Sequence, residues 1–179
     1  MTFKIVKAEE TDYQLFASVI QEVYEALEQK EWFAADNAEY TYHMLKDCNG
    51  VGYKAVHEPS GAVAGIFLVT FPGNSEENLG RDIGLSEEAL SLVAQMDSVA
   101  ILPQYRGAGL QKRLMQHAER ELTEQGYRYF MCTVHPENRY SRQNVISQGY
   151  EPVKSALKYG GYLLSLIHIS EPTRPISIS

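Results

Sequence analysis

The sequence predicts a single α/β domain in which helices flank a mixed β-sheet. Three observations support this fold class. The chain has 179 residues, 44% of them hydrophobic and 22% charged, which is typical of a globular protein with a substantial core. Strand-like and helix-like hydrophobic periods follow one another in the order β-α-α-β-β-β-α-β-α-β. One run, residues 127–134 (YRYFMCTV), is too continuously apolar to have a wet face and therefore predicts a central strand.

The first elements are a strand and two helices. A short strand is expected at residues 3–9. Thr11 and Gln14 fit a capping box that would start a helix ending near Glu28. That helix is predicted by apolar residues at helical spacing, namely Leu15, Phe16, Val19, Ile20, Val23 and Leu27. A second helix follows and is expected to reach Leu45.

The middle of the chain is rich in strands. Two β-rich runs, residues 51–58 and 62–71, are joined by Pro-Ser-Gly and predict a hairpin. The polar, acidic stretch at residues 72–90 is expected to end in a short helix that begins near Ser86. Residues 94–102 predict the next strand.

Two further helices and a strand complete the expected domain. A glycine-rich motif opens a helix that is expected to run to Gln125, with Gly126 as the stop. This helix has apolar residues at every fourth position, namely Leu110, Leu114, Ala118 and Leu122. Residues 135–149 predict another helix, and residues 150–159 another strand.

Charge and cysteine content limit the class of protein. The formal net charge of −7 offers no basic face for nucleic acid, and it suits a cationic small-molecule partner. No run approaches membrane-spanning length, and the start has no apolar targeting segment, so we expect no membrane partner and a cytoplasmic location. Cys48 and Cys132 are expected to be reduced core thiols. No cluster has metal-ligand spacing, so no metal is expected.

The motif LPQYRGAGLQKRL, residues 102–114, changes the chain from strand to helix within a few residues. Gly107 and Gly109 would let backbone N–H groups approach a ligand closely, and a helix start offers N–H groups without an internal partner. These features predict an anion site. The alternative is an ordinary strand-to-helix turn that uses glycine.

The element order and this motif resemble the GNAT superfamily of acyl-CoA-dependent N-acetyltransferases, over the chain up to about Leu164. Residues 99–111 (VAILPQYRGAGLQ) are similar to the family's strand-Pro-x-Tyr-Arg-Gly-x-Gly segment. Anchored on the strand, the family consensus R/Q-x-x-G-x-G/A falls on Arg106, Gly109 and Gln111. The last of these departs from the usual Gly or Ala. A register that starts earlier, at Gln104, matches the letters fully, but the strand anchor puts the helix start where the phosphates bind.

The resemblance implies acetyl-CoA as the acyl-donor cosubstrate. N–H groups of the motif would hold its pyrophosphate at the positive end of the helix. The residues concerned are Arg106, Gly107, Ala108, Gly109, Leu110 and Gln111. In the family the pantetheine arm pairs with the end of the fourth strand, here Val99 and Ile101. Asn138 and Ser141 match an Asn and a small residue that lie beside the cofactor at the next helix start. The alternative is that these two residues only cap that helix.

Acetyl transfer to an amine needs a base, because an ammonium with a pKa of about 10.4 stays protonated at neutral pH. Asp97 is the predicted base. Period-two alternation puts Asp97 and Gln95 on the same side of the strand as Val99 and Ile101. The rival base is His135, and the alternative for Asp97 is a purely structural carboxylate.

The family's usual acid is a Tyr seven residues after the helix-start Asn, and here that position is Val145. Tyr140 is the predicted substitute. Otherwise Tyr140 packs or binds the adenine side, and the thiolate leaves without a dedicated acid.

The acceptor pocket is predicted from aromatic and acidic residues near the first two helices and the third-to-fourth strand connection. Tyr24, Trp32 and Phe33 would line an amine pocket. The carboxylates that would attract a cation are Glu31, Glu76 and Glu77. The alternative is that the aromatics belong to the core and the carboxylates to a solvated face.

The end of the chain differs from the rest. Residues 165–174 (SLIHISEPTR) resemble the in-frame translation of a sequencing adaptor. We therefore expect a domain of residues 1–164 and a non-native tail of residues 165–179, with SLIHIS standing in for a final strand.

Together these features predict an N-acetyltransferase that moves an acetyl group from acetyl-CoA to a small-molecule amine, and they allow a homodimer. One alternative is a non-catalytic protein of the same fold that binds acyl-CoA for regulation. Another is a nucleotide or phosphate binder, although the chain has neither a Walker GK[ST] nor a Rossmann GxGxxG.

Overall fold

A computed structural model describes residues 2–27, 38–158 and 161–170. Their strands form one seven-stranded sheet in the order β1-β2-β3-β4-β5-β7-β6. The strands are β1 (Phe3–Lys7), β2 (Gly50–His57), β3 (Val63–Thr70), β4 (Val93–Ile101), β5 (Tyr129–Val134), β6 (Glu151–Lys158) and β7 (Gly161–Ile169). Neighbouring strands are antiparallel except β4 and β5, which are parallel. The predicted mixed, mostly antiparallel sheet is therefore confirmed.

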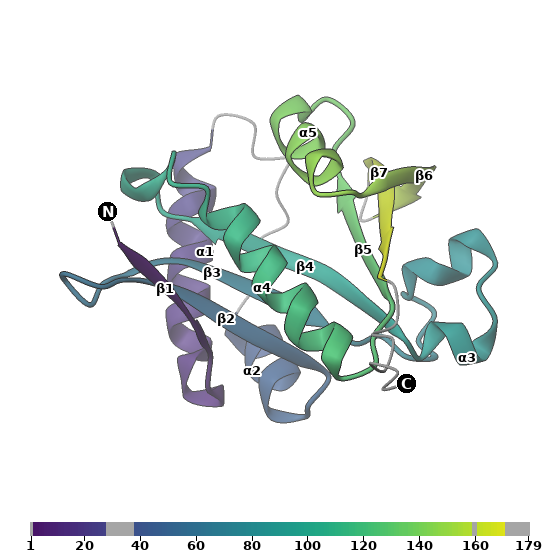
Figure 1. Cartoon of the computed structure of the whole chain (residues 1–179), viewed down its shortest axis with the longest axis horizontal. Helices are drawn as coiled ribbons and strands as arrows, with labels where there is room; N and C mark the ends of the chain where they lie inside the picture. The colour runs from purple at the N-terminus through teal and green to yellow at the C-terminus, as the bar shows by residue number, and fades with distance from the viewer. Residues whose placement is uncertain (1, 28–37, 159–160, 171–179) are drawn as a thin grey trace, which may run out of the picture.

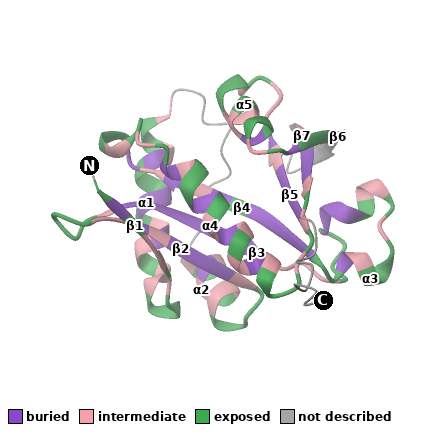
Figure 2. Cartoon of the chain, in the orientation of Figure 1, coloured by how far each residue is buried: buried purple, intermediate pink, exposed green. Residues whose placement is uncertain are grey.

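Helices cover both faces of this sheet (Figure 1). They are α1 (Tyr13–Ala26), α2 (Ala38–Lys46), α3 (Glu87–Leu90), α4 (Leu110–Glu124) and α5 (Arg139–Ser147). The apolar side of α4 packs on one face of the sheet, whereas α1 packs on the other. Buried residues line the strands on both faces, and exposed residues line the outer sides of the helices (Figure 2).

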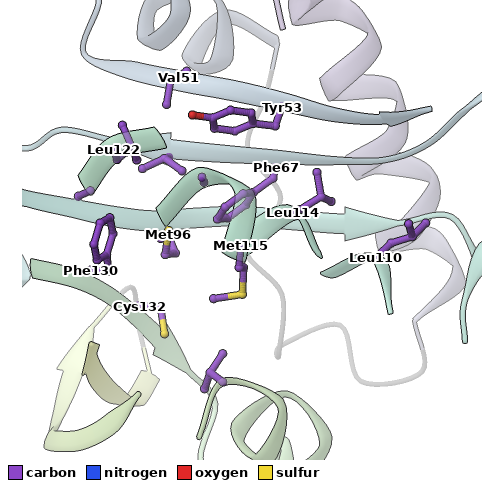
Figure 3. Close-up of a cluster of buried hydrophobic side chains, with 14 of the residues drawn as sticks. Val51, Tyr53, Phe67, Met96, Leu110, Leu114, Met115, Leu122, Phe130 and Cys132 are labelled. Carbon is purple, nitrogen blue, oxygen red and sulfur yellow. The ribbon is translucent and has the colours of Figure 1, made fainter. Parts of the chain in front are cut away.

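The larger core lies between α4 and the sheet. Leu110, Leu114 and Leu122 of α4 are almost completely buried against Tyr53 and Phe67 of the central strands (Figure 3). Burying a side chain of this size removes apolar area worth about 1.5–3 kcal/mol of transfer free energy. The every-fourth-residue pattern therefore identified the helix and the face that it buries.

The second core lies on the opposite face. Phe16 and Ile20 of α1 pack there against Ile66 and Leu68 of β3 and Ala100 of β4. Residues on one strand thus alternate between the two cores, as period-two geometry requires. This alternation determines which β4 side chains can face α4.

Most predicted elements occur close to their expected bounds, but the start of α1 differs. The backbone N–H of Glu9 donates to Asp12 Oδ2 at 2.9 Å, and Asp12 N donates back to the Glu9 carbonyl. The expected capping box at Thr11 and Gln14 is therefore wrong. A short 3₁₀ turn before α1 (Glu10–Asp12) moves the box two residues toward the N-terminus.

The adaptor-like segment lies inside the sheet. Strand β7 continues through Leu164 and pairs with β5 as far as Ile169 opposite Tyr129. Ser165 and Leu166 are completely buried. The expectation that SLIHIS lies in the sheet as a strand is confirmed for residues 165–169, whereas the origin of this segment and a domain end at residue 164 stay predictions.

The two cysteines differ in burial. Cys132 on β5 is buried, as expected of a core thiol, and its burial raises the pKa of the thiol to about 12. Cys48 is exposed, in the turn between α2 and β2, and has a φ of 58°. The expectation that Cys48 is a core residue is therefore wrong.

Candidate functional site

The parallel strands β4 and β5 separate near the middle of β4. They pair only from Val93 opposite Tyr129 to Gln95 opposite Met131. Beyond this point β4 continues to Ile101 while still pairing with β3. Its other edge, from residue 96 to residue 101, therefore pairs with no strand among the described residues, and Figure 1 shows the two strands diverging there. An open strand edge of this kind can accept an extended ligand by hydrogen bonding.

A β-bulge lies where the strands begin to separate. Leu68 is opposite Ser98 and Val69 is opposite Met96, so Asp97 is the extra residue of β4. Its side chain is exposed, and the hydroxyl of Tyr40 on α2 donates to Asp97 Oδ2 at 3.0 Å. The predicted base thus lies at the point where the two strands part.

The bulge changes the predicted alternation along β4. Val99 and Ile101 pack with the core beneath α4. Gln95 instead accepts a hydrogen bond from the N–H of Leu79 at 2.7 Å, and Asp97 contacts α2, which packs with the core on the other face. The expectation that Gln95 and Asp97 share the side of Val99 and Ile101 is wrong, because one extra residue shifts the phase of the strand.

The glycine-rich motif joins the end of β4 to α4. A short 3₁₀ turn (Pro103–Tyr105) follows the strand, and Arg106 N donates to the Pro103 carbonyl at 3.3 Å. Gly107 has a φ of 89° and Gly109 a φ of 68°. These are left-handed conformations that side chains with a Cβ rarely adopt. A Cβ at either position would meet nothing within 4 Å, so the backbone there borders open space.

The first turn of α4 has no capping side chain. Gly109 is the N-cap residue, and among the described residues no side-chain cap bonds to the helix start. The first bond that closes the helix runs from Arg113 N to the Gly109 carbonyl at 3.1 Å. The N–H groups of Leu110, Gln111 and Lys112 precede that bond, so they point out of the helix as orphan donors. They form the positive end of the helix dipole and suit an anion.

The other residues of the predicted phosphate site surround this helix start. Arg106 is exposed, whereas Ala108 and Gln111 are half-buried. Leu110 is buried and anchors the helix in the core beneath it. The structure thus brings residues 106–111 together at one helix start, with Val99 and Ile101 on the strand that leads to it.

The start of α5 is built differently. Asn138 Oδ1 accepts a hydrogen bond from Ser141 N at 3.2 Å and thereby caps the helix. Asn138 and Ser141 are both half-buried. The capping alternative is therefore confirmed for the Asn138 oxygen, while contact with a cofactor stays a prediction.

The candidates for proton transfer around α5 differ in exposure. Tyr140 is 81% exposed in the first turn of α5, so its ring does not pack in the core. Val145, at the family's usual Tyr position, is buried among the residues beneath α4. His135 follows β5 and accepts a hydrogen bond at Nδ1 from Glu137 N at 3.2 Å. That bond puts the proton of the neutral ring on Nε2, and the role of His135 as the rival base stays a prediction.

The structure describes only some of the residues that were predicted to bind the acceptor amine. Tyr24 is half-buried near the end of α1, whereas Glu31, Trp32 and Phe33 lie outside the described residues. Glu76 and Glu77 are exposed in the connection from β3 to the start of β4. That connection lies at the end of β4 opposite the glycine motif, so the structure does not bring these two carboxylates to the site (Figure 1).

One partly buried polar cluster was not predicted from the sequence. Glu119 of α4 accepts hydrogen bonds from the Tyr150 hydroxyl and from His168 Nδ1 of β7, the latter at 3.2 Å. Burial raises the pKa of Glu119, although both hydrogen bonds act in the opposite direction. Burial and the nearby Glu119 carboxylate raise the pKa of Tyr150 well above its ordinary value. Three segments far apart in sequence form this cluster, so no local pattern signals it.

Two classes of feature are absent from the part of the chain that the structure describes. No group of three His, Cys, Asp or Glu side chains there could hold a metal ion. Within the same residues, no helix is both long enough and apolar enough to cross a membrane.

Comparisons with known proteins identify the fold. A family model described as the acetyltransferase (GNAT) family matches residues 13–150. No curated protein matches the sequence. An acetyltransferase of the GNAT family from Streptococcus pneumoniae is 16% identical with a TM-score of 0.70, and the match covers 94% of this chain and 100% of that one.

Two further solved structures are similar. The NatC complex bound to Gag peptide and CoA contains a chain that is 17% identical with a TM-score of 0.71, and the match covers 96% of this chain and 100% of that one. The ribosomal-protein-S18-alanine N-acetyltransferase from Escherichia coli is 15% identical with a TM-score of 0.67, covering 93% of this chain and 91% of that one. At such identities the likeness concerns the fold alone.

Proposed function

The chain belongs to the acetyltransferase (GNAT) family, and we propose that it transfers an acetyl group from acetyl-CoA to a primary amine. One observation carries the proposal. The open edge of β4 leads directly into an uncapped helix start with two left-handed glycines, at Gly107 and Gly109. An open edge suits the extended pantetheine arm, and the orphan N–H groups suit the pyrophosphate. Neither feature is needed for an ordinary strand-to-helix turn.

In this proposal each group has a defined task. The N–H groups of residues 107–111 bind the pyrophosphate beside Arg106, and the edge at Val99 and Ile101 orients the arm. The bound thioester supplies an electrophilic acetyl carbon. An N–H group on the open edge of β4 stabilises the negative charge that develops on the acetyl oxygen. That charge develops as the amine nitrogen forms the new C–N bond, and the carbonyl re-forms as the C–S bond breaks.

Proton transfer is assigned to the exposed groups near the separation of the strands. Asp97 takes a proton from the substrate ammonium, which leaves the neutral amine free to attack, and the second proton that the nitrogen loses on forming the amide goes to solvent. Tyr140 is the proposed donor to the departing thiolate, because Val145 has no proton to give. A thiol with an ordinary pKa of about 8.5 is a good leaving group, so the loss of this acid costs less than the loss of the base.

The acceptor is proposed to be an amine with a net positive charge. The net charge of −7 favours a small cationic amine. The similar structures include an enzyme named for a ribosomal-protein alanine and a complex with a peptide. They support a peptide α-amine as the second acceptor class.

A second candidate function is a non-catalytic protein that binds acyl-CoA. It is favoured by Val145, which is only 3% exposed and fills the family's Tyr position with core packing. Such a protein would bind acetyl-CoA without accelerating acetyl transfer to any amine.

The test is a calorimetric titration of acetyl-CoA into the full chain, with ATP and NAD as controls, followed by an amine screen. The screen contains polyamines and peptides that begin with alanine, and it follows release of free thiol. Binding of acetyl-CoA alone, with thiol release that depends on one acceptor, is the expected result. Binding without acceptor-dependent release would favour the non-catalytic alternative. If acetyl-CoA does not bind to the folded chain, both the acetyltransferase function and the non-catalytic binding function are contradicted.

A further inference from the structure

We propose that Tyr40 is a positioning residue that orients the carboxylate of Asp97 for proton transfer. This inference rests on the proposed acetyl transfer and on Asp97 as its base. Tyr40 lies in the first turn of α2, and its hydroxyl donates to Asp97 Oδ2 at 3.0 Å. The two residues are 57 positions apart in sequence. Sequence reasoning predicted Asp97 and gave no role to Tyr40.

The need for a positioning group follows from the bulge. Asp97 is the unpaired residue of β4 between Met96 and Ser98, and its side chain is exposed. A regular strand fixes the direction of each side chain through its pleat, whereas a bulge locally disrupts the ladder. An exposed carboxylate at a bulge samples several rotamers unless a neighbour holds it. The bond from Tyr40 supplies such a hold.

Tyr40 is itself fixed in place. Its ring is half-buried and packs against the core formed by α1, β3 and the end of β4. The next residue, Thr41, is completely buried, and Met44 and Leu45 pack on the same core. The hydroxyl is therefore carried by a ring with restricted motion, which reduces the entropy lost when it binds the carboxylate.

The bond has a chemical consequence for the base. It occupies Oδ2 and so sets the plane of the carboxyl group and the direction in which the group accepts a proton. A catalytic group displaced by about 1 Å can lose about 10²-fold in rate. The bond also connects α2 to the point where β4 and β5 separate, so the position of the base depends on the packing of α2.

The experiment is a double-mutant cycle in the full chain with Tyr40→Phe, Asp97→Asn and the double variant. Transfer is followed with the acceptor that the amine screen identifies, and acetyl-CoA affinity is measured by calorimetry. Tyr42→Phe is the matched control. Tyr42 lies on the same helix, and its ring contacts Tyr13 and Lys46.

Tyr40→Phe should lower kcat about tenfold, with KM and acetyl-CoA affinity unchanged within twofold. Asp97→Asn should lower kcat about 100-fold. The double variant should match Asp97→Asn alone, because Tyr40 acts only through that carboxylate. Tyr42→Phe should leave kcat unchanged.

Other outcomes overturn separate parts of the argument. Multiplicative losses in the double variant, or a Tyr40→Phe variant at the wild-type rate, would overturn the role of Tyr40 alone. An Asp97→Asn variant at the wild-type rate would overturn Asp97 as the base, and Tyr40 with it, while leaving acetyl transfer intact. A wild-type chain without transfer to any amine would overturn the proposed function itself. Tyr40→Phe keeps the packed ring, and its unfolding curve by circular dichroism verifies that the variant is folded.

Discussion

Two helices begin near the gap between β4 and β5, and their first turns are built in opposite ways. The start of α5 is completed by its own side chain, since Asn138 Oδ1 caps Ser141 N. The start of α4 has no capping side chain and places Gly109 at the N-cap with a φ of 68°. Asn is among the best N-cap residues, and Gly is poorer. At the start of α5 a side chain therefore pairs with a backbone N–H group, whereas the start of α4 leaves its N–H donors unpaired.

Under the proposed function, this difference predicts that the α4 start is the one that binds a ligand. A left-handed glycine in open space suits a tight turn, as at Gly61, and the entropy it loses on folding is larger than that of any other residue. A backbone of this kind is useful when a ligand must approach the N–H groups closely. The comparison predicts that substitutions at the α4 start reduce binding, whereas substitutions at the α5 start reduce stability.

The largest expected effect comes from Gly109→Val. A β-branched residue resists a φ of 68°, so the N–H groups of the first turn lose their arrangement, and its side chain enters the open space before the helix. We expect acetyl-CoA affinity to fall at least 100-fold by calorimetry. The strain should cost about 1–2 kcal/mol of stability. The fold should survive, because a Cβ at this position meets nothing within 4 Å.

Gly61→Val is the matched control for that prediction. Gly61 has a φ of 72°, also borders open space, and lies in the turn between β2 and β3. It should show a similar loss of stability and unchanged acetyl-CoA affinity. Wild-type affinity in Gly109→Val would show that the glycines of the motif serve only the turn.

The second prediction tests the α5 start. Asn138→Ala removes the cap of Ser141 N, which should cost about 1 kcal/mol and lower Tm by about 2–4 °C in a chain of this size. Acetyl-CoA affinity should change by less than about fivefold. Thermal unfolding and calorimetry on the same sample provide both values. A 100-fold loss of acetyl-CoA affinity at unchanged Tm would contradict this difference between the two helix starts, and α5 would then be a second principal binding element.

The sequence allowed both helix starts to be predicted, because their signals are local. Glycine spacing after a strand identified the α4 start, and an Asn before a helical pattern identified the α5 start. The bulge at Asp97 has no such signal. It depends on the register between β4 and β3, which is a long-range property, so period-two alternation placed Asp97 on the wrong face.

Contacts between distant segments were missed for the same reason. Tyr40 and Asp97 meet only because α2 packs on the sheet beside the bulge. Glu119, Tyr150 and His168 meet because α4, the residue before β6, and β7 converge. Hydrophobic periodicity shows which face of an element is buried, and it does not show which polar side chain on another element it will meet.

The third prediction concerns this cluster, which joins α4 to the chain after α5. The raised pKa of Glu119 means that the folded state keeps a proton that the unfolded state loses above a pH of about 4.3. Stability therefore falls as pH rises from there through the folded pKa, and the loss is complete above it. Glu119→Gln keeps an acceptor for the Tyr150 hydroxyl and removes the charge. Its stability relative to wild type should rise between pH 4.5 and pH 8, so its Tm should exceed that of wild type by more at pH 8 than at pH 4.5.

Circular dichroism melts at several pH values provide the measurement for Glu119→Gln. Glu124→Gln is the control, since Glu124 is exposed on the same helix. Its stability should follow that of wild type at each pH. A Glu119→Gln variant that loses stability at pH 8 would mean that the charged carboxylate is stabilised by its two hydrogen bonds more than burial penalises it.

The smallest effect is expected for Gln111→Ala, and it separates backbone from side chain at the α4 start. Gln111 stands at the motif position where the resemblance implies Gly or Ala, and it is half-buried. If backbone N–H groups alone hold the pyrophosphate, removing this side chain should change acetyl-CoA affinity by less than threefold in calorimetry. Ala is the better helix former by a few tenths of a kcal/mol, so Tm should stay constant or rise slightly. A tenfold weaker affinity would instead assign the Gln111 amide a direct contact with the phosphates. The α4 start would then bind the phosphates through a side chain as well as through its backbone N–H groups. The two helix starts would therefore differ less than the backbone geometry at Gly107 and Gly109 indicates.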